Sequence, residues 1–130
     1  MKGLFQNVDC ISFFVDDLDE GIRFYSETLG LKLLWRAENS CGLGMENDIT
    51  ELVLVNEHNP MVDFKVECVE DAVKTFVDAG GKCVYGPFDI DIGKCVVVED
   101  RWENKFCMLD MSKGTYDVDE DGNVIGVSKD

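Results

Sequence analysis

The feature that most constrains the fold of this chain is an internal repeat with an offset of 51 residues. In this alignment the apolar strand and helix positions of one half, and a closing glycine, meet equivalent positions in the other half. The matched pairs are Ile11 with Val62, Phe13 with Phe64, Val15 with Val66, Leu18 with Val69, Ile22 with Val73, Tyr25 with Phe76 and Gly30 with Gly81. A half of this size buries its own sheet poorly, so the repeat predicts two similar modules that pack together.

Each half begins with a strand followed by a helix. Residues 11–15 alternate with the period of a strand. Asp17 and Glu20 fit an N-cap and its capping box, and Gly30 is a typical helix stop. The helical stripe between them consists of Leu18, Ile22, Tyr25 and Leu29. The second stripe consists of Val69, Val73, Phe76 and Val77, with Glu70 and Asp71 in the first turn and Gly80-Gly81 at the end.

Three further strand-like runs follow each helix. They cover residues 31–37, 41–45 and 51–55 in the first half and residues 82–88, 94–99 and 105–110 in the second half. Turn-forming residues separate them. The offset grows to about 55 by the last strand, which places Leu52 on Cys107 and Leu54 on Leu109. The pattern predicts an α+β fold with two βαβββ modules, at about 8–56 and about 60–111.

The segment 113–130 predicts an added β-hairpin. Alternating residues flank Asp121-Gly122, a pair that favours a tight hairpin turn. The same stretch also matches the start of a calcium-binding loop. Its twelfth position is Ser128, where such a loop needs a bidentate glutamate, so we favour the hairpin.

Composition limits the partners and the compartment. The 130 residues predict one domain, and 12 Lys and Arg against 27 Asp and Glu give a formal net charge of −15. A chain this acidic is a poor partner for nucleic acid. We expect no membrane span and no secretory signal, and therefore a cytoplasmic protein. Six cysteines without a C-x-x-C pair favour reduced thiols over a disulfide framework.

Several local motifs, taken in order, resemble one known superfamily. They are the opening strand from Asp9 to Leu18, Phe24-Tyr25, Leu29-Gly30-Leu31, Gly80-Gly81, Gly86-Pro87-Phe88, Gly93 and the turn Asp100-Arg101-Trp102-Glu103-Asn104. Over about residues 8–111 the chain resembles the vicinal oxygen chelate superfamily, which contains glyoxalase I, bleomycin-resistance proteins and extradiol dioxygenases. The resemblance implies a curved mixed sheet around a cavity, a metal in that cavity and pairing of chains into a homodimer.

The resemblance also implies where metal ligands would lie, and this sequence departs from the pattern there. The family's ligand positions map to Cys10, Leu52 (or Glu51 if the register shifts by one), Met61 and Cys107. The single histidine, His58, lies in the predicted link between modules, so one chain cannot supply a two-histidine site. We expect the site to have lost its metal and to need no cofactor. The alternative is a soft or divalent metal bound through sulfur donors.

Strand alternation selects the side chains that face the cavity. Cys10, Ser12 and Phe14 share one face of the first strand, and Asp63 shares a face with Met61. Aromatic side chains can stack on a flat or cationic ligand, although core packing also explains them. Carboxylates at Glu51, Asp63 and Asp110 are further candidates. The predicted cavity residues are Cys10, Ser12, Phe14, Trp35, Leu52, Met61, Asp63, Phe88, Trp102 and Cys107.

Three hypotheses for the function follow. The first is a module with a degenerate metal site that binds a small organic molecule, cationic or aromatic, in a metal-free cavity. The second is a metal-dependent lyase, isomerase or dioxygenase with an atypical site, which rests on the family alone. The third is a thiol-based soft-metal or toxicant resistance protein, which requires Cys10 and Cys107 to share one cavity.

Overall fold

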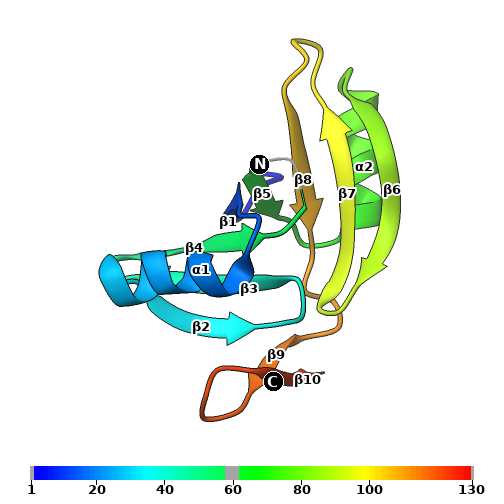
Figure 1. The fold of residues 1–130 in the computed structure, drawn as a ribbon. Helices are drawn as coiled ribbons and strands as arrows, with labels where there is room; N and C mark the ends of the chain where they lie inside the picture. The colour runs from blue at the N-terminus through cyan, green and yellow to red at the C-terminus, as the bar shows by residue number, and fades with distance from the viewer. Residues whose placement is uncertain (1, 58–61, 130) are drawn as a thin grey trace.

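The computed structural model describes residues 2–57 and 62–129, and it has the predicted α+β architecture (Figure 1). One mixed sheet of eight strands carries both modules, and a separate two-stranded hairpin follows it. Module one contains β1 (Asn7–Phe14), α1 (Leu18–Ile22), η1 (Arg23–Thr28), β2 (Lys32–Arg36), β3 (Ser40–Met45) and β4 (Asp48–Val55). Module two contains β5 (Val62–Lys65), α2 (Val69–Asp78), β6 (Lys82–Ile90), β7 (Gly93–Glu99) and β8 (Lys105–Leu109). The hairpin strands are β9 (Thr115–Val118) and β10 (Val124–Ser128).

The strand order β2-β3-β4-β1-β5-β8-β7-β6 makes the two modules mirror one another across the middle of the sheet. The first strand of each module pairs in parallel with its last strand, and the two first strands, β1 and β5, pair antiparallel. This central pairing joins the modules in one continuous sheet, so the repeat found in the sequence corresponds to two halves of one structure.

The register corrects the predicted offset of the last strands. Ser12 pairs with Val53 in module one, and Asp63 pairs with Cys107 in module two. The first strands are therefore related by 51 residues (63 − 12) and the last strands by 54 (107 − 53). The predicted offset of about 55 is one residue too long, and a one-residue error exchanges the two faces of a strand.

The helices begin and end where the sequence predicts. The Asp17 side chain accepts a hydrogen bond from Glu20 N at 3.1 Å, and Gly30 has a φ of 84°. From Arg23 onward the first helix is a π-helix, in which Leu29 N donates to Phe24 O at 3.0 Å. The sequence pattern does not distinguish this wider helix from an α-helix. No helix in the described ranges is long and apolar enough to cross a membrane.

The helices cover one face of the sheet and leave the other face for the cavity. On the helix side, Leu43 and Leu54 belong to the core under α1, and Val96 and Met108 belong to the core under α2. On the opposite face, a smaller cluster forms around Cys95, Cys107 and Leu109. Strand alternation accounts for this division, since Met108 lies between two residues of the opposite face.

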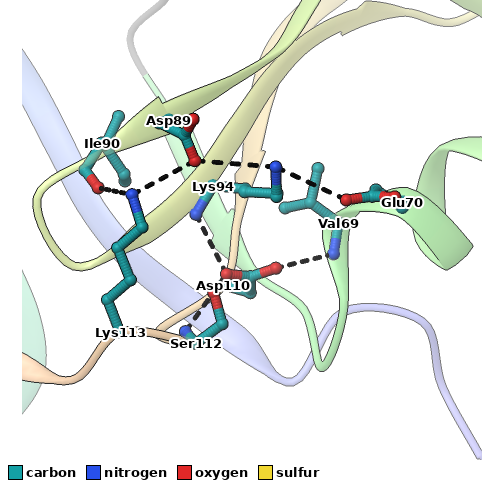
Figure 2. Close-up of polar contacts among 8 residues, drawn as sticks. All are labelled: Val69, Glu70, Asp89, Ile90, Lys94, Asp110, Ser112 and Lys113. Atoms are coloured by element: carbon teal, nitrogen blue, oxygen red, sulfur yellow. Dashed lines mark hydrogen bonds and ion pairs between the residues drawn. The ribbon is translucent and has the colours of Figure 1, made fainter.

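Asp110, just after β8, ties the second module together (Figure 2). Its buried carboxylate accepts hydrogen bonds from Val69 N at 2.9 Å, Lys94 N at 3.0 Å and Ser112 N at 3.2 Å. Cys68, the N-cap residue of α2, makes no side-chain cap, so Asp110 supplies the missing acceptor. Burial opposes ionisation, but these hydrogen bonds lower the pKa of Asp110. Asp110 is structural and does not line the cavity.

The C-terminal hairpin is confirmed, and it contacts both modules. At its root, Lys113 Nζ lies 3.1 Å from Asp89 Oδ1 of β6 (Figure 2). At its tip, Arg36 N of β2 donates to Gly122 O at 2.8 Å. Asp119, in the stretch that matches a calcium loop, accepts from Asp121 N and Asn123 N of its own turn, each at 2.9 Å.

Candidate functional site

A cavity of about 370 Å³ lies between the open face of the central strands and the hairpin. Its walls come from both modules and from β9. The side chains of β1, β4 and β5 form its floor, Trp35 and Leu34 of β2 form one side, and Tyr116 of β9 forms part of the cover. The volume falls within the range of small-molecule sites.

Four polar side chains form a row across the four central strands. Cys10 on β1 pairs with Glu51 on β4 and with Asp63 on β5, and Asp63 pairs with Cys107 on β8. The row from β4 to β8 is therefore Glu51, Cys10, Asp63 and Cys107. The first three of these residues line the cavity directly.

Asp63 lies in the middle of this row between two thiols. Cys10 Sγ donates to Asp63 Oδ2 at 3.4 Å, and the Cys107 thiol donates from the other side. Burial, with a smaller contribution from the charge of Asp9, raises the pKa of Asp63 to about 6, although these thiol hydrogen bonds act in the opposite direction. Asp63 therefore changes its charge close to neutral pH, unlike an ordinary aspartate.

The two thiols beside Asp63 are not activated. Burial, together with the carboxylates of Asp63 and Asp9, raises the pKa of Cys10. A hydrogen bond with Cys95, followed by burial, raises the pKa of Cys107. Both side chains are therefore protonated at neutral pH, and a protonated thiol is a poor nucleophile and a poor metal ligand.

Glu51 is held by Trp35. Trp35 Nε1 donates to Glu51 Oε1 at 2.6 Å, and the indole crosses the intervening strand β3 at Gly42. A Cβ at position 42 would overlap the indole and lie 2.6 Å from Glu51 Oε1. Burial raises the pKa of Glu51, the Trp35 hydrogen bond opposes this shift, and the charge of Asp9 adds to it.

Asp9 is the third carboxylate of the cavity. The β1–β5 register shifts between Val8 and Cys10, and this irregularity brings consecutive residues, Asp9 and Cys10, to the same cavity. Burial raises the pKa of Asp9, and the charge of Lys65 opposes the shift. None of the described residues that line the cavity is a lysine or an arginine.

The hairpin contributes an aromatic wall. The rings of Tyr116 and Trp35 lie with centroids 4.9 Å apart and planes tilted by 40°. Burial raises the pKa of Tyr116, and the charges of Asp91 and Glu51 raise it further. Thr115 and Val118 of the same strand also line the cavity.

The predicted cavity residues divide into two groups. Cys10, Ser12, Trp35 and Asp63 line the cavity, and Cys107 lies beside Asp63 at its edge. Leu52 packs instead on the helix side, and Glu51 takes the cavity position. This corrects the assignment of Leu52, for which Glu51 is the one-residue alternative. Met61, like His58, lies outside the described residues.

Three predicted aromatic residues lie away from the cavity. Phe14 is 44% exposed at a separate surface groove with Phe24. Phe88 packs against the Cys95 and Cys107 cluster. Trp102 is 68% exposed in the β7–β8 turn, where Arg101 stacks on its ring. Strand alternation predicts that Phe14 faces the cavity, but Phe14 is the last residue of β1 and does not line it. Aromatic character makes Phe88 and Trp102 candidates, but it does not predict where β6 and the β7–β8 turn place them.

The described cavity residues, as they are arranged, do not converge on a site for the metal that the family resemblance implies. Within residues 2–57 and 62–129, no group of three or more His, Cys, Asp and Glu side chains is placed to hold a metal ion. Cys10 directs its thiol proton at Asp63, and Glu51 is engaged by the Trp35 indole. A divalent metal would need these donors deprotonated and free to converge.

The sequence alone did not single out Asp9, Thr115 or Tyr116. An irregularity in the β1–β5 register brings Asp9 to the cavity, and no local sequence pattern predicts it. The hairpin was predicted, but where it lies against the sheet depends on contacts distant in sequence, such as Gly122 with Arg36.

The chain matches a known family over most of its length. The family model described as Glyoxalase/Bleomycin resistance protein/Dioxygenase superfamily matches residues 7–108. No curated protein matches the chain.

Several solved structures share the fold at low sequence identity. A methylmalonyl-CoA epimerase from Mycobacterium tuberculosis is 14% identical with a TM-score of 0.69, over 86% of this chain and 92% of that one. A Legionella pneumophila protein described as an NAD-dependent benzaldehyde dehydrogenase is 18% identical with a TM-score of 0.65, over 79% and 98%. Homoprotocatechuate 2,3-dioxygenase from Brevibacterium fuscum is 21% identical with a TM-score of 0.61, over 82% and 37%. Likeness at these identities concerns the fold and not the chemistry.

Proposed function

The chain belongs to the Glyoxalase/Bleomycin resistance protein/Dioxygenase superfamily, and we propose that its cavity binds a small organic cation without a metal ion. The observation that carries this proposal is the charge of the cavity lining. Asp9, Glu51 and Asp63 line the cavity, and no lysine or arginine accompanies them among the described lining residues.

The three carboxylates favour a positively charged ligand. Each has a pKa raised chiefly by burial, so each ionises at a cost. A cation in the cavity offsets that cost and favours the ionised forms. The net charge of −15 acts in the same direction, since an acidic protein attracts cations at long range.

The remaining walls favour an organic cation over an inorganic one. Val53, Val55 and Leu109 present apolar surface, and Trp35 and Tyr116 present aromatic surface. Aromatic faces attract organic ammonium groups, and apolar walls bury the carbon body that carries the charge.

A second candidate function is general acid–base catalysis by Asp63 on the bound cation. The observation that favours it is a partly buried carboxyl whose pKa, about 6, lies close to neutral pH. A 2-ammonio ketone in D₂O tests it, since a base in the cavity exchanges the hydrogens beside the carbonyl. Exchange that Asp63→Asn abolishes supports catalysis, and exchange at the rate of buffer alone excludes it for this substrate.

The thiol-based hypothesis receives less support than cation binding. Asp63 separates Cys10 from Cys107 in the row, and Cys107 packs against Cys95 and Leu109. Both thiols are held in the protonated form, which disfavours attack on a toxicant.

Calorimetric titration with three matched ligands tests the proposal. Benzylammonium, benzyl alcohol and benzoate share one ring and differ in charge. We expect benzylammonium to bind at least about tenfold more tightly than benzyl alcohol, and benzoate not to bind. Asp63→Asn and Glu51→Gln should each weaken the binding, whereas Asp78→Asn, at an exposed position on α2, should leave it unchanged. Equal affinities for the cation and the alcohol, or no binding of either, would contradict the proposal.

A further inference from the structure

We infer that the C-terminal hairpin sets the ligand preference of the cavity: Tyr116 positions Trp35, Trp35 positions Glu51, and together they select an ammonium group attached to a flat aromatic ring. This inference rests on the proposed function. It concerns an element outside the segment that matches the family model, since the match ends at residue 108 and the hairpin strands begin at Thr115.

The hairpin is fixed at both ends, one on each module. Lys113 Nζ contacts Asp89 Oδ1 at 3.1 Å and Ile90 O at 3.2 Å, and Lys113 N donates to Ile92 O at 2.9 Å. At the other end, Gly122 O accepts from Arg36 N on β2. The hairpin is therefore attached to both modules, below β2 in Figure 1, and its strand β9 lines the cavity.

A continuous chain of contacts leads from this wall to the carboxylate. Tyr116 packs on the Trp35 ring at 4.9 Å between centroids, and Trp35 Nε1 donates to Glu51 at 2.6 Å. Trp35 follows Leu34, which also lines the cavity, on the edge strand β2. Because the hairpin covers the indole, loss of the Tyr116 ring should free the indole to leave Glu51.

The arrangement defines a ligand class. The aromatic pair forms a wall, and Glu51 lies where that wall meets the floor of the cavity. A ligand that places a flat ring against Trp35 and Tyr116 brings a nearby ammonium group to Glu51 on β4, with Asp9 on the neighbouring strand β1 and Asp63 on β5 beyond it. An arylalkylammonium ion meets both requirements, and a small cation without a ring meets only one.

A titration without ligand tests the positioning role. In a Trp102→Phe background Trp35 is the single tryptophan, so its fluorescence against pH reports the ionisation of Glu51. Glu51→Gln identifies the transition that belongs to Glu51, as distinct from Asp9, Asp63 and Tyr116. Tyr116→Leu keeps the apolar cover but loses the ring. It should raise this midpoint by about half a pH unit, a threefold change in the ionisation constant, because the indole hydrogen bond holds the pKa down.

Two control variants separate positioning from general damage. Tyr116→Phe keeps the ring, so its midpoint should stay close to that of the protein with Tyr116. Ile125→Thr, at a 68% exposed position on β10, should leave the midpoint unchanged. An unchanged midpoint in Tyr116→Leu would overturn the positioning role, whether or not any cation binds.

Ligand selectivity tests the second half of the inference. In the Trp102→Phe background, Tyr116→Leu should reduce the preference for benzylammonium over methylammonium at least about fivefold. An equal loss for both cations, or none, would overturn the assignment of ligand class and leave cation binding intact. If neither cation binds to protein with an unsubstituted cavity, the proposed function itself is overturned, and the ligand class with it.

Discussion

Trp35 and Glu51 lie on strands separated by β3, and they nevertheless share a hydrogen bond of 2.6 Å. The indole reaches across β3 because Gly42 has no side chain to block it. A single glycine thus allows an aromatic wall and a half-buried carboxylate to meet in the cavity. The proposed cation site depends on this pairing.

Replacement of that glycine should damage the site more than the fold. In Gly42→Ala the new Cβ would overlap the Trp35 indole, so the side chain must move and Glu51 must lose its donor. We expect affinity for benzylammonium to fall at least about fivefold, measured by calorimetry. Gly126→Ala on β10 is the matched control, because its Cβ would meet Asp117 Oδ2 at an ordinary 3.7 Å. Equal affinities in the two variants would show that the Trp35–Glu51 contact plays no part in binding.

Asp63 should make stability depend on pH in an unusual direction. Its pKa rises from an ordinary 3.8 to about 6 in the folded protein. The contribution of protonated Asp63 to the free energy of unfolding is therefore complete below pH 3.8, and it is lost as pH rises through about 6. Asp63→Asn should increase the free energy of unfolding by up to about 3 kcal/mol at pH 8 and change it little near pH 4. Urea denaturation at both pH values measures this, and a variant destabilised equally at each pH would refute it.

Asp110 should behave in the opposite way. Its pKa is lowered, so its contribution is present above the ordinary carboxyl pKa and is lost as pH falls through the lower folded value. Asp110→Asn should lower the free energy of unfolding at pH 7 by about 2–4 kcal/mol, since three backbone donors share this carboxylate. Asp89→Asn, at an exposed ion pair, should change it far less. Similar losses in the two variants would mean that the buried hydrogen bonds contribute little.

Two turns share one hydrogen-bond pattern, but only one of them has a glycine at its fourth position. Asp100 accepts from Trp102 N and Asn104 N, just as Asp119 accepts from Asp121 N and Asn123 N. The fourth residue of each turn is left-handed, Glu103 with φ 70° and Gly122 with φ 88°.

Glycine adopts this conformation without steric cost, whereas glutamate adopts it with strain, so Glu103→Gly should stabilise the protein by about 0.5–1 kcal/mol. The reciprocal change, Gly122→Ala, should destabilise it. Thermal unfolding of both variants measures the effect. A destabilised Glu103→Gly would show that the Glu103 side chain contributes more than its backbone strain costs.

Much of the fold could be predicted from the sequence because its signals are local and repeated. The Asp17 cap, the stop at Gly30 and the apolar alternation of Ile11 and Phe13 each act over a few residues, and the structure bears them out. The repeat then links two such segments into one sheet. A π-helix replaced part of the first helix, because the same stripe suits either geometry.

The candidate site was harder to predict because it depends on register and on distant contacts. An offset of 55 instead of 54 placed Leu52 in the cavity. The alternation along the strand already indicated that Leu52 and Leu54 share one face and that Glu51 lies on the other. The position of Tyr116 depends on where the hairpin lies, and the inclusion of Asp9 depends on an irregularity in the β1–β5 pairing.

The indole resonance of Trp35 gives the most direct test of cation binding in this cavity. In ¹⁵N-labelled Trp102→Phe protein it is the single indole N–H signal, and its proton points at Glu51. Benzylammonium should shift it saturably at pH 7.5. The affinity should fall as pH is lowered through about 6, because Asp63 takes up a proton. A resonance that stays in place, or that moves equally with benzyl alcohol, would contradict the account.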